Sequence, residues 1–216
     1  MLSSKTILFA LSAFLAGVVA SPVAAPSSGC ADVHIITARA STEAPGEGII
    51  GTVVGNVVTR SAQTVSRESV DYPAVLFPYD PSEQAGVTAM TALLARKTSA
   101  CPNTKIVLMG YSQGAQVSGD VLQARAPGTN KVVAVVLMGD PAHVHGESFQ
   151  KGTANQLNGL FPRTPGALEA FSAQLASYCD VGDLFCASGT STAIHLGYVT
   201  EYGTAATNFV LGRIGG

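Results

Sequence analysis

Residues 105 to 114 read Lys-Ile-Val-Leu-Met-Gly-Tyr-Ser-Gln-Gly, a buried β-strand pattern that runs directly into a Gly-x-Ser-x-Gly motif. Between a strand and a helix, this motif forms a tight, strained turn that lifts the serine hydroxyl clear of the backbone. Its glycines keep the neighbouring chain from clashing with the turn. The motif is only moderately specific, because small residues also flank serines in ordinary turns. Ser112 is therefore the first candidate nucleophile, and a purely structural turn is the alternative.

The rest of the chain alternates short β-rich runs with longer segments of helical spacing. Strands are expected at residues 33–37, 70–76, 105–109, 132–138 and 175–178, and helices at 48–66, 82–97, 112–125 and 201–214. Residues 140–165, rich in Gly, Pro, His and Asn, are expected to form a long surface loop. The alternation predicts an α/β fold, a five-stranded parallel sheet flanked by helices with right-handed crossovers.

Several polar residues follow these predicted strands. In open parallel sheets, ligands bind at the carboxyl ends of the strands. Ser41, Ser112 and Asp140 each come after a strand, so we expect them to share that edge of the sheet.

The N-terminal residues have the layout of a cleavable signal peptide. Lys5 precedes a short apolar run over residues 7–20, and small residues follow. A membrane-spanning helix would need about 20 apolar residues, so this run is too short to be an anchor. Residues 1–20 are therefore predicted to be a signal peptide, cleaved after Ala20 or Ala25, and the protein is predicted to be secreted and extracellular.

The remaining chain fits one domain. Residues 21–29 are rich in Pro, Ala and Ser and are expected to be disordered, which leaves residues 30–216 as a single folded unit. Charged residues make up 12% of the chain and the formal net charge is −2. Nothing in this charge balance favours binding to nucleic acid. We expect a monomer without a membrane anchor.

The four cysteines are expected to pair, because a secreted chain folds in an oxidising compartment. Cys30 and Cys101 each lie just upstream of a predicted strand. If those strands are parallel neighbours, the two cysteines lie at the same edge of the sheet and can be joined. Cys179 and Cys186 then close a short loop.

A serine hydroxyl becomes a good nucleophile when a base removes its proton and a carboxylate holds that base. In hydrolases of this architecture these groups follow the order Ser, acid, His along the chain. Of the four histidines, His34 precedes Ser112 inside a predicted strand, and His143 and His145 lie in the Gly- and Pro-rich loop. His195, near the end of the domain, is the candidate base, with a surface-loop histidine as the alternative.

Three aspartates compete for the role of the acid. Asp140 stands in Met-Gly-Asp-Pro at a strand end, where an aspartate that caps a turn is the simpler explanation. Asp180 and Asp183 both lie between Cys179 and Cys186, and their positions in the sequence do not separate them.

An oxyanion hole requires donors aimed at the charge that develops on the carbonyl oxygen. The backbone amide of Gln113, the residue after the nucleophile, is one candidate donor. The second donor usually comes from the loop after an adjacent strand, here residues 39–43, Arg-Ala-Ser-Thr-Glu. The alternative for this loop is a polar turn with a helix cap.

Together these features resemble the cutinase and acetylxylan esterase family, secreted serine esterases with a minimal α/β-hydrolase fold that is a three-layer sandwich. The resemblance extends from Cys30 to about Ile214. It rests on Ala38-Arg39-Ala40-Ser41-Thr42-Glu43, Cys101-Pro102, Gly110 to Gly114, Cys179 to Cys186, and His195 with Gly197-Tyr198.

The resemblance implies a role for each candidate. Asp183, four residues after the first cysteine of its loop, matches the family's acid, Ser112 the nucleophile and His195 the base. Ser41 and Gln113 match the oxyanion donors. The family also pairs Cys30 with Cys101 and Cys179 with Cys186.

The two branches of the family are not separated by the sequence. The four cysteines and the loop 39–43 resemble cutinases, whereas Tyr72-Pro73-Ala74 and residues 138–141 resemble acetylxylan esterases. Residues 187–193 are small and polar, where cutinases present an apolar rim. The resemblance thus favours short acyl esters such as acetylated xylan over cutin, polyester or longer acyl chains.

The expected activity is hydrolysis of a carboxylic ester through an acyl-enzyme, on a plant cell-wall polysaccharide or a polyester. The resemblance implies no metal and no organic cofactor. The alternative from a different class is a secreted binding module that keeps the fold without its chemistry, because a fold alone does not fix function.

Overall fold

The computed structural model describes residues 29–215. The predicted signal peptide over residues 1–20, both of its predicted cleavage sites and nearly all of the segment 21–29 lie outside the described residues. Within residues 29–215, no helix combines the length and apolar character needed to cross a membrane.

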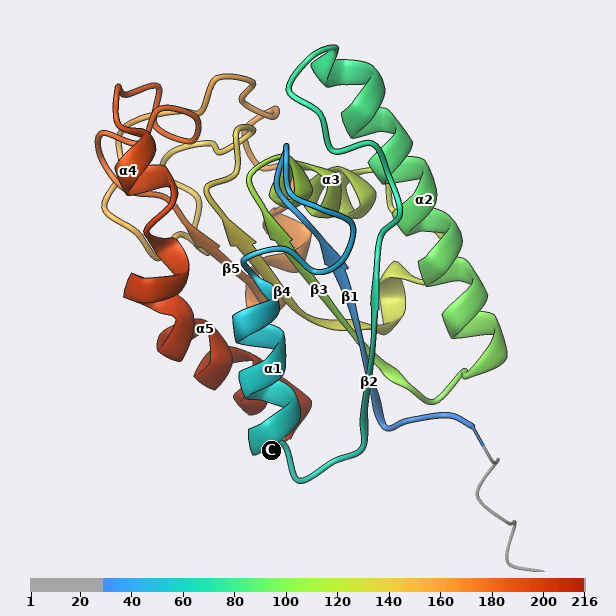
Figure 1. Ribbon diagram of the computed structural model, residues 1–216. Helices are drawn as coiled ribbons and strands as arrows, with labels where there is room; N and C mark the ends of the chain where they lie inside the picture. The colour runs from blue at the N-terminus through green and yellow to red at the C-terminus, as the bar shows by residue number, and fades with distance from the viewer. Residues whose placement is uncertain (1–28, 216) are drawn as a thin grey trace, which may run out of the picture.

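The domain is a three-layer α/β sandwich around a five-stranded parallel sheet (Figure 1). The strand order is β2-β1-β3-β4-β5, and every neighbouring pair is parallel. The strands are β1 Val33–Ala38, β2 Val65–Ser69, β3 Lys105–Tyr111, β4 Val132–Met138 and β5 Leu175–Tyr178. The predicted fold class is confirmed.

The helices cover both faces of this sheet. α1 and α5 pack on one face and α2 and α3 on the other, each layer with its own apolar core. Their bounds are α1 Gly51–Arg60, α2 Tyr79–Ala100, α3 Gln113–Gln123, α4 Thr192–His195 and α5 Tyr198–Ile214, with 3₁₀ turns at Thr129–Lys131 and Glu169–Gln174.

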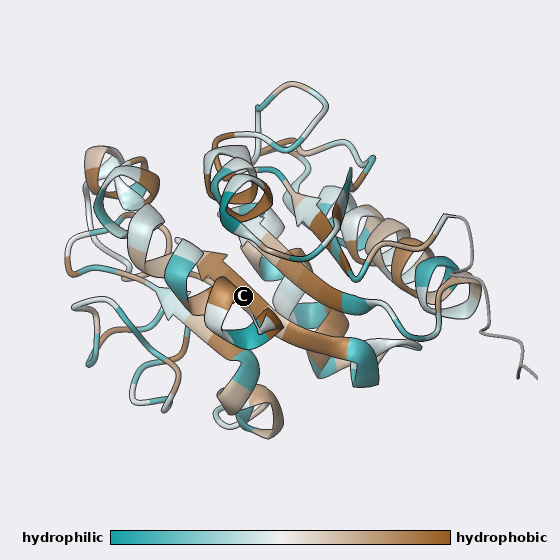
Figure 2. Cartoon of the chain, turned by 90° about the horizontal axis from the view of Figure 1, so that it is seen from below, coloured by the Kyte–Doolittle hydropathy of each residue, from teal (hydrophilic) through white to brown (hydrophobic). Residues whose placement is uncertain are grey.

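The strands at the centre are apolar on both sides. Along β4, Ala134, Val136 and Met138 join the core under α1 and α5, whereas Val135 and Leu137 join the core under α2 and α3. This alternation follows from the two-residue period of a strand. Figure 2 shows the result as brown strands between helices with paler outer faces.

The prediction for residues 48–76 was wrong in detail. α1 ends at Arg60, and the strand that follows is the polar stretch Val65–Ser69 rather than residues 70–76. β2 lies at the edge of the sheet, so it has a neighbour on one side only and its residues are half-buried or exposed. The apolar residues after it, including Val70 and Tyr72, are buried beyond the strand, in the core beside α2.

Both predicted disulfides are present. Cys30–Cys101 joins the segments that lead into β1 and β3. Cys179–Cys186 closes a loop directly after β5. The second loop encloses Asp180 and Asp183, two of the three candidate acids, at the carboxyl edge of the sheet.

Candidate active site

Ser112 lies on a sharp turn between β3 and α3, with φ 53° and ψ −121°. This left-handed backbone is strained for a residue with a side chain and persists where its surroundings enforce it. A Cβ on Gly110 would lie 2.1 Å from the Gly114 carbonyl oxygen, and a Cβ on Gly114 2.1 Å from that of Ala38. Both glycines of the motif are therefore required, and the predicted sharp turn at Ser112 is present.

The elbow opens into a pocket of about 230 Å³ at the carboxyl edge of the sheet. Ser112 is 8% exposed in this pocket. The walls come from the loop after β1, the segment before α2, the disulfide loop and the turn around α4. Lining residues include Ser41, Thr42, Ile49, Leu76, Phe185, Thr192, His195 and Leu196.

His195 and Asp183, the candidate base and one candidate acid, form a hydrogen-bonded pair at this pocket. His195 Nδ1 lies 2.8 Å from Asp183 Oδ2. His195 ends the short helix α4, whose first turn is capped by the hydroxyl of Ser191, an acceptor for the Ile194 amide at 3.2 Å. The pair is buried, with Asp183 0% and His195 5% exposed.

Asp183 is held ionised by its donors. Its Oδ1 accepts the amides of Phe185 at 2.6 Å and Cys186 at 2.9 Å, and its Oδ2 accepts the Tyr198 hydroxyl at 2.8 Å as well as His195. Burial acts to raise the pKa of Asp183, but the hydrogen bonds and the charge of His195 outweigh it and lower that pKa below the ordinary 3.8. The carboxylate therefore stays charged throughout the neutral range.

Ser112 and His195 line the same pocket, yet the structure of residues 29–215 shows no hydrogen bond between them. Because Nδ1 faces Asp183, Nε2 is the ring nitrogen that remains for Ser112. In unliganded enzymes, the contact between nucleophile and base is often long and shortens when substrate binds.

Ser41 and Gln113, the two candidate oxyanion donors, lie beside Ser112, the candidate nucleophile. The hydroxyl oxygen of Ser41 is buried and has no hydrogen-bond partner among the described residues. Gln113 is the first residue of α3, where a backbone amide has no acceptor within the helix. Its side chain is engaged elsewhere, with Nε2 3.0 Å from the Val75 carbonyl and Oε1 3.0 Å from the Ser82 hydroxyl. Only its main-chain amide remains for a ligand.

The loop that carries Ser41 is fixed by Glu43. Its two carboxylate oxygens accept the amides of Ala40 and Ile49, both at 2.7 Å. Arg39, 3% exposed, donates to the Glu43 carbonyl at 3.0 Å and to the Tyr72 carbonyl at 2.5 Å. These bonds hold the loop rigid beside the elbow.

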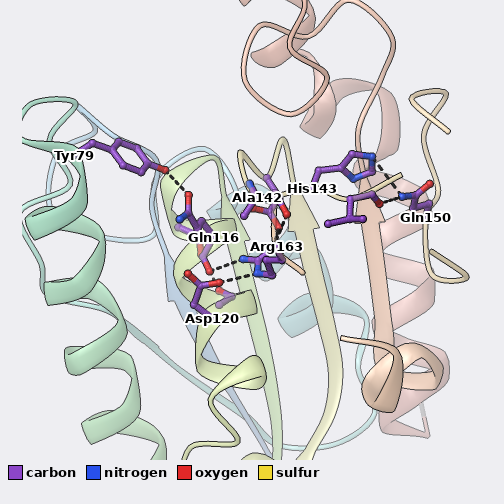
Figure 3. Close-up of polar contacts among 11 residues, drawn as sticks. Tyr79, Gln116, Asp120, Ala142, His143, Gln150 and Arg163 are labelled. Atoms are coloured by element: carbon purple, nitrogen blue, oxygen red, sulfur yellow. Dashed lines mark hydrogen bonds and ion pairs between the residues drawn. The ribbon is translucent and has the colours of Figure 1, made fainter. Parts of the chain in front are cut away.

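The other two candidate acids have structural partners instead. Asp140 pairs with the buried guanidinium of Arg163, which also binds Asp120 at 2.6 Å and the Gln116 carbonyl at 2.8 Å (Figure 3). This network fastens the long loop 140–165 to α3. Asp180 Oδ1 accepts the amide of Thr153 at 2.8 Å and the hydroxyl of Tyr202 at 2.9 Å.

The other histidines also bind elsewhere. His34 Nδ1 lies 2.8 Å from the Ser66 hydroxyl in the sheet, and His143 Nε2 3.2 Å from the Ala154 carbonyl. His145 is bonded to Asn158 at 2.8 Å. None of the three lines the pocket that contains Ser112.

The sequence prediction gave no role to two tyrosines beside Asp183 and His195, although Tyr198 is among the residues that carry the family resemblance. The Tyr111 hydroxyl donates to the carbonyl oxygen of His195, and the Tyr198 hydroxyl donates to Asp183. Both side chains are fully buried. For Tyr111 the available signal was a tyrosine within an otherwise apolar run, because a buried tyrosine hydroxyl usually has a polar partner.

Comparisons with known proteins identify the family of this chain. The chain matches the Cutinase family profile over residues 29–214. It is 33% identical to Acetylxylan esterase 2 of Talaromyces purpureogenus, over 86% of this chain and 88% of that protein. It is 31% identical to Cutinase 11 of Verticillium dahliae, over 86% of this chain and 70% of that protein.

The solved structures point the same way. An iodinated complex of acetyl xylan esterase superposes with a TM-score of 0.80 at 32% identity, covering 86% of this chain and 99% of that one. A cutinase-like protein from Cryptococcus superposes with a TM-score of 0.76 at 25% identity, covering 89% of this chain and 99% of that one. The chain therefore belongs to the cutinase family, as a serine carboxylic ester hydrolase with an α/β-hydrolase fold.

Proposed function

We propose that Ser112, His195 and Asp183 are the nucleophile, base and acid of this esterase. The Ser41 hydroxyl and the Gln113 amide are the proposed oxyanion donors. The observation that carries the proposal is the 2.8 Å bond from His195 to the buried carboxylate of Asp183 at the pocket that contains Ser112.

In the first half of the reaction, His195 Nε2 takes the proton of Ser112 as its oxygen attacks the carbonyl carbon of the ester. The oxyanion that forms accepts hydrogen bonds from Ser41 and Gln113. The carbon–oxygen bond to the alcohol then breaks, and His195 returns the proton to the departing alcohol. In the second half, His195 deprotonates water, whose oxygen attacks the carbonyl carbon of the acyl-enzyme. The bond from that carbon to the Ser112 oxygen then breaks, and His195 returns the proton to Ser112 as the acid leaves.

Covalent labelling tests this assignment directly. A nitrophenyl phosphonate is expected to modify Ser112 at a stoichiometry of one, because an activated serine attacks phosphorus and displaces nitrophenolate. The labelling rate is expected to fall as the pH drops, because protonated His195 no longer accepts the proton. Peptide mass spectrometry locates the label. A protein that stays unlabelled, as expected of a binding module, would refute the proposal.

We propose short acyl esters such as acetylated xylan as the substrate. The pocket of about 230 Å³ accommodates a small acyl group beside Ser112. Residues 187–193 between the disulfide loop and α4 are small and polar, which suits a polysaccharide alcohol. Two similar proteins are named acetylxylan esterases.

Longer acyl chains or a polyester are the second candidate, favoured by the apolar rim of the pocket. Leu76 and Phe77, before α2, are 54% and 90% exposed, and Leu196, after α4, is 61% exposed. Leu76 and Leu196 line the pocket. The small, polar residues 187–193 predicted no apolar rim. The segment before α2 and the residue after α4 supply the apolar side chains instead.

The secreted state is part of this proposal. Two disulfides suit an oxidising compartment, and residues 1–20 have the layout of a signal peptide. We propose an extracellular monomer in which residues 30–216 form the esterase domain.

Chain-length preference separates the two substrate candidates. We expect rates on nitrophenyl esters to decrease from acetate through butyrate to palmitate, with acetylated xylan also deacetylated. Replacing Phe77 by serine is expected to leave the acetate rate within about twofold, because a two-carbon acyl group does not reach an exposed rim. The Val58→Ser variant, on α1, is the control for loss of an exposed apolar side chain.

The opposite pattern would contradict the short-acyl proposal. A rate maximum at palmitate, with a loss of about tenfold or more on palmitate in Phe77→Ser alone, would show that the rim binds the acyl chain.

A further inference from the structure

Tyr198 links the start of α5 to the disulfide loop. Its side chain is fully buried. Its hydroxyl donates to Asp183 Oδ2 at 2.8 Å, accepts the amide of Asp180 at 2.9 Å and lies 3.2 Å from Cys186 Sγ. The proposed reaction steps assign roles to Asp183 and His195 but none to the Tyr198 hydroxyl that contacts Asp183.

We infer that Tyr198 is a positioning residue, which orients the Asp183 carboxylate and limits how strongly that carboxylate stabilises protonated His195. The inference rests on the proposed function, because it requires His195 to be the base.

The orientation follows from the set of donors around Asp183. Two backbone amides fix Oδ1, so the carboxylate can still tilt about the direction of those bonds. Tyr198 and His195 share Oδ2 as donors, both at 2.8 Å. The bond from Tyr198 therefore sets where Oδ2 lies relative to His195.

The ring of Tyr198 is itself held in place. It meets the His195 ring edge-on, with centroids 6.4 Å apart and an interplanar angle of 89°. It lies 6.2 Å from the ring of Tyr111, whose hydroxyl donates to the His195 carbonyl. A rigid, buried ring is what a positioning donor requires.

The hydroxyl remains a donor at every working pH. Burial first, and then the charge of Asp183, raise the pKa of Tyr198 far above its ordinary 10.0. The other ionisable groups around this pair are Asp180 after β5, whose amide donates to Tyr198, Tyr111 on β3, and Tyr202 on α5, whose ring stacks on that of Tyr198.

Removing the Tyr198 hydroxyl is expected to shift the pH profile of kcat/KM in one defined direction. A carboxylate with one hydrogen bond fewer is more basic and stabilises the neighbouring imidazolium more strongly. His195 then keeps its proton to higher pH, so the acid limb of the pH profile of kcat/KM shifts to higher pH. A purely structural loss would lower the active fraction without moving that limb.

The test is Tyr198→Phe, which removes only the hydroxyl. On nitrophenyl acetate we expect kcat to fall about tenfold or more, with KM within about twofold, as for other groups that orient a reacting side chain. The acid limb is expected to move up by about half a pH unit.

Tyr202→Phe is the matched control. Tyr202 lies one turn along α5 and donates to Asp180 rather than to Asp183. It should leave the acid limb in place and kcat within about twofold. Equal losses in the two variants, with the limb unmoved in both, would overturn the inference.

A second substitution avoids the loss of packing. Site-specific 3-fluorotyrosine at position 198 keeps the ring and makes the hydroxyl a stronger donor, so the acid limb should move down instead of up. An unmoved limb in folded 3-fluorotyrosine protein would overturn the inference even if Tyr198→Phe does not fold. Phosphonate labelling of Ser112 in wild-type protein reports separately on the proposed function.

Discussion

The Ser112→Ala variant is expected to lose about 10⁴- to 10⁶-fold in kcat on nitrophenyl acetate. The oxyanion donors and the base remain, but no oxygen is left to form the acyl-enzyme. Its fold should be unchanged, because alanine has the same backbone restrictions at φ 53° as serine. Initial rates at substrate saturation measure the loss in kcat. The thermal unfolding midpoint checks that the variant is folded.

Ser118→Ala is the matched control for Ser112→Ala. Ser118 lies on the same helix, and its hydroxyl donates to the Gly114 carbonyl at 2.8 Å, away from the pocket lining. We expect its kcat to stay within about threefold of wild type. If Ser112→Ala keeps wild-type turnover, another residue is the nucleophile and the assignment fails.

The Asp183→Asn variant is expected to lose about 10⁴-fold in kcat. The two backbone amides at Oδ1 select the amide oxygen of asparagine, which turns its NH₂ group toward His195. His195 Nδ1 then has to accept, so its proton moves to Nε2. A protonated Nε2 cannot take the proton of Ser112. The pH profile of kcat and the yield of phosphonate label both report this loss.

Asp180→Asn is the matched control from the same disulfide loop. Asp180 is bonded to Thr153 and Tyr202 and does not contact His195. Its substitution should lower stability while kcat stays within about fivefold. Because the pKa of Asp183 is lowered below the ordinary 3.8, this carboxylate stays ionised in the neutral range and its protonation does not limit the wild-type enzyme there. A larger kcat loss in Asp180→Asn than in Asp183→Asn would show that Asp180, and not Asp183, is the catalytic acid.

The central part of the fold was predictable because its signals are local. β3, the Gly-x-Ser-x-Gly turn and β4 follow from unbroken apolar runs and two required glycines, and both cores confirm them. The edge strand Val65–Ser69 was not predictable in this way. An edge strand buries little, so the apolar run just after it, around Val70 and Tyr72, gave the stronger but misleading signal.

The candidate site was predictable only as a short set of alternatives. Residue order left Asp140, Asp180 and Asp183 open, and the family resemblance favoured Asp183. The structure shows why the other two differ: Asp140 binds Arg163, and Asp180 binds Thr153 and Tyr202. These partners lie more than 20 residues away in the sequence, so no local sequence pattern indicates the contacts.

The sequence by itself determined the alternating α/β architecture and the elbow at Ser112, because each depends on residues close together or on a simple repeat. The pairing of Cys30 with Cys101, 71 residues apart, followed from the predicted strand positions and the family resemblance. Only the tertiary structure decided that Asp183 contacts His195, that the Tyr198 hydroxyl donates to the same carboxylate oxygen, and that the exposed side chains of Leu76 and Leu196 line the pocket. The Asp183 contacts span 12 and 15 residues of loop and short helix, a stretch without a regular period. The rim joins residues 76 and 196, which meet only at the carboxyl edge of the folded sheet.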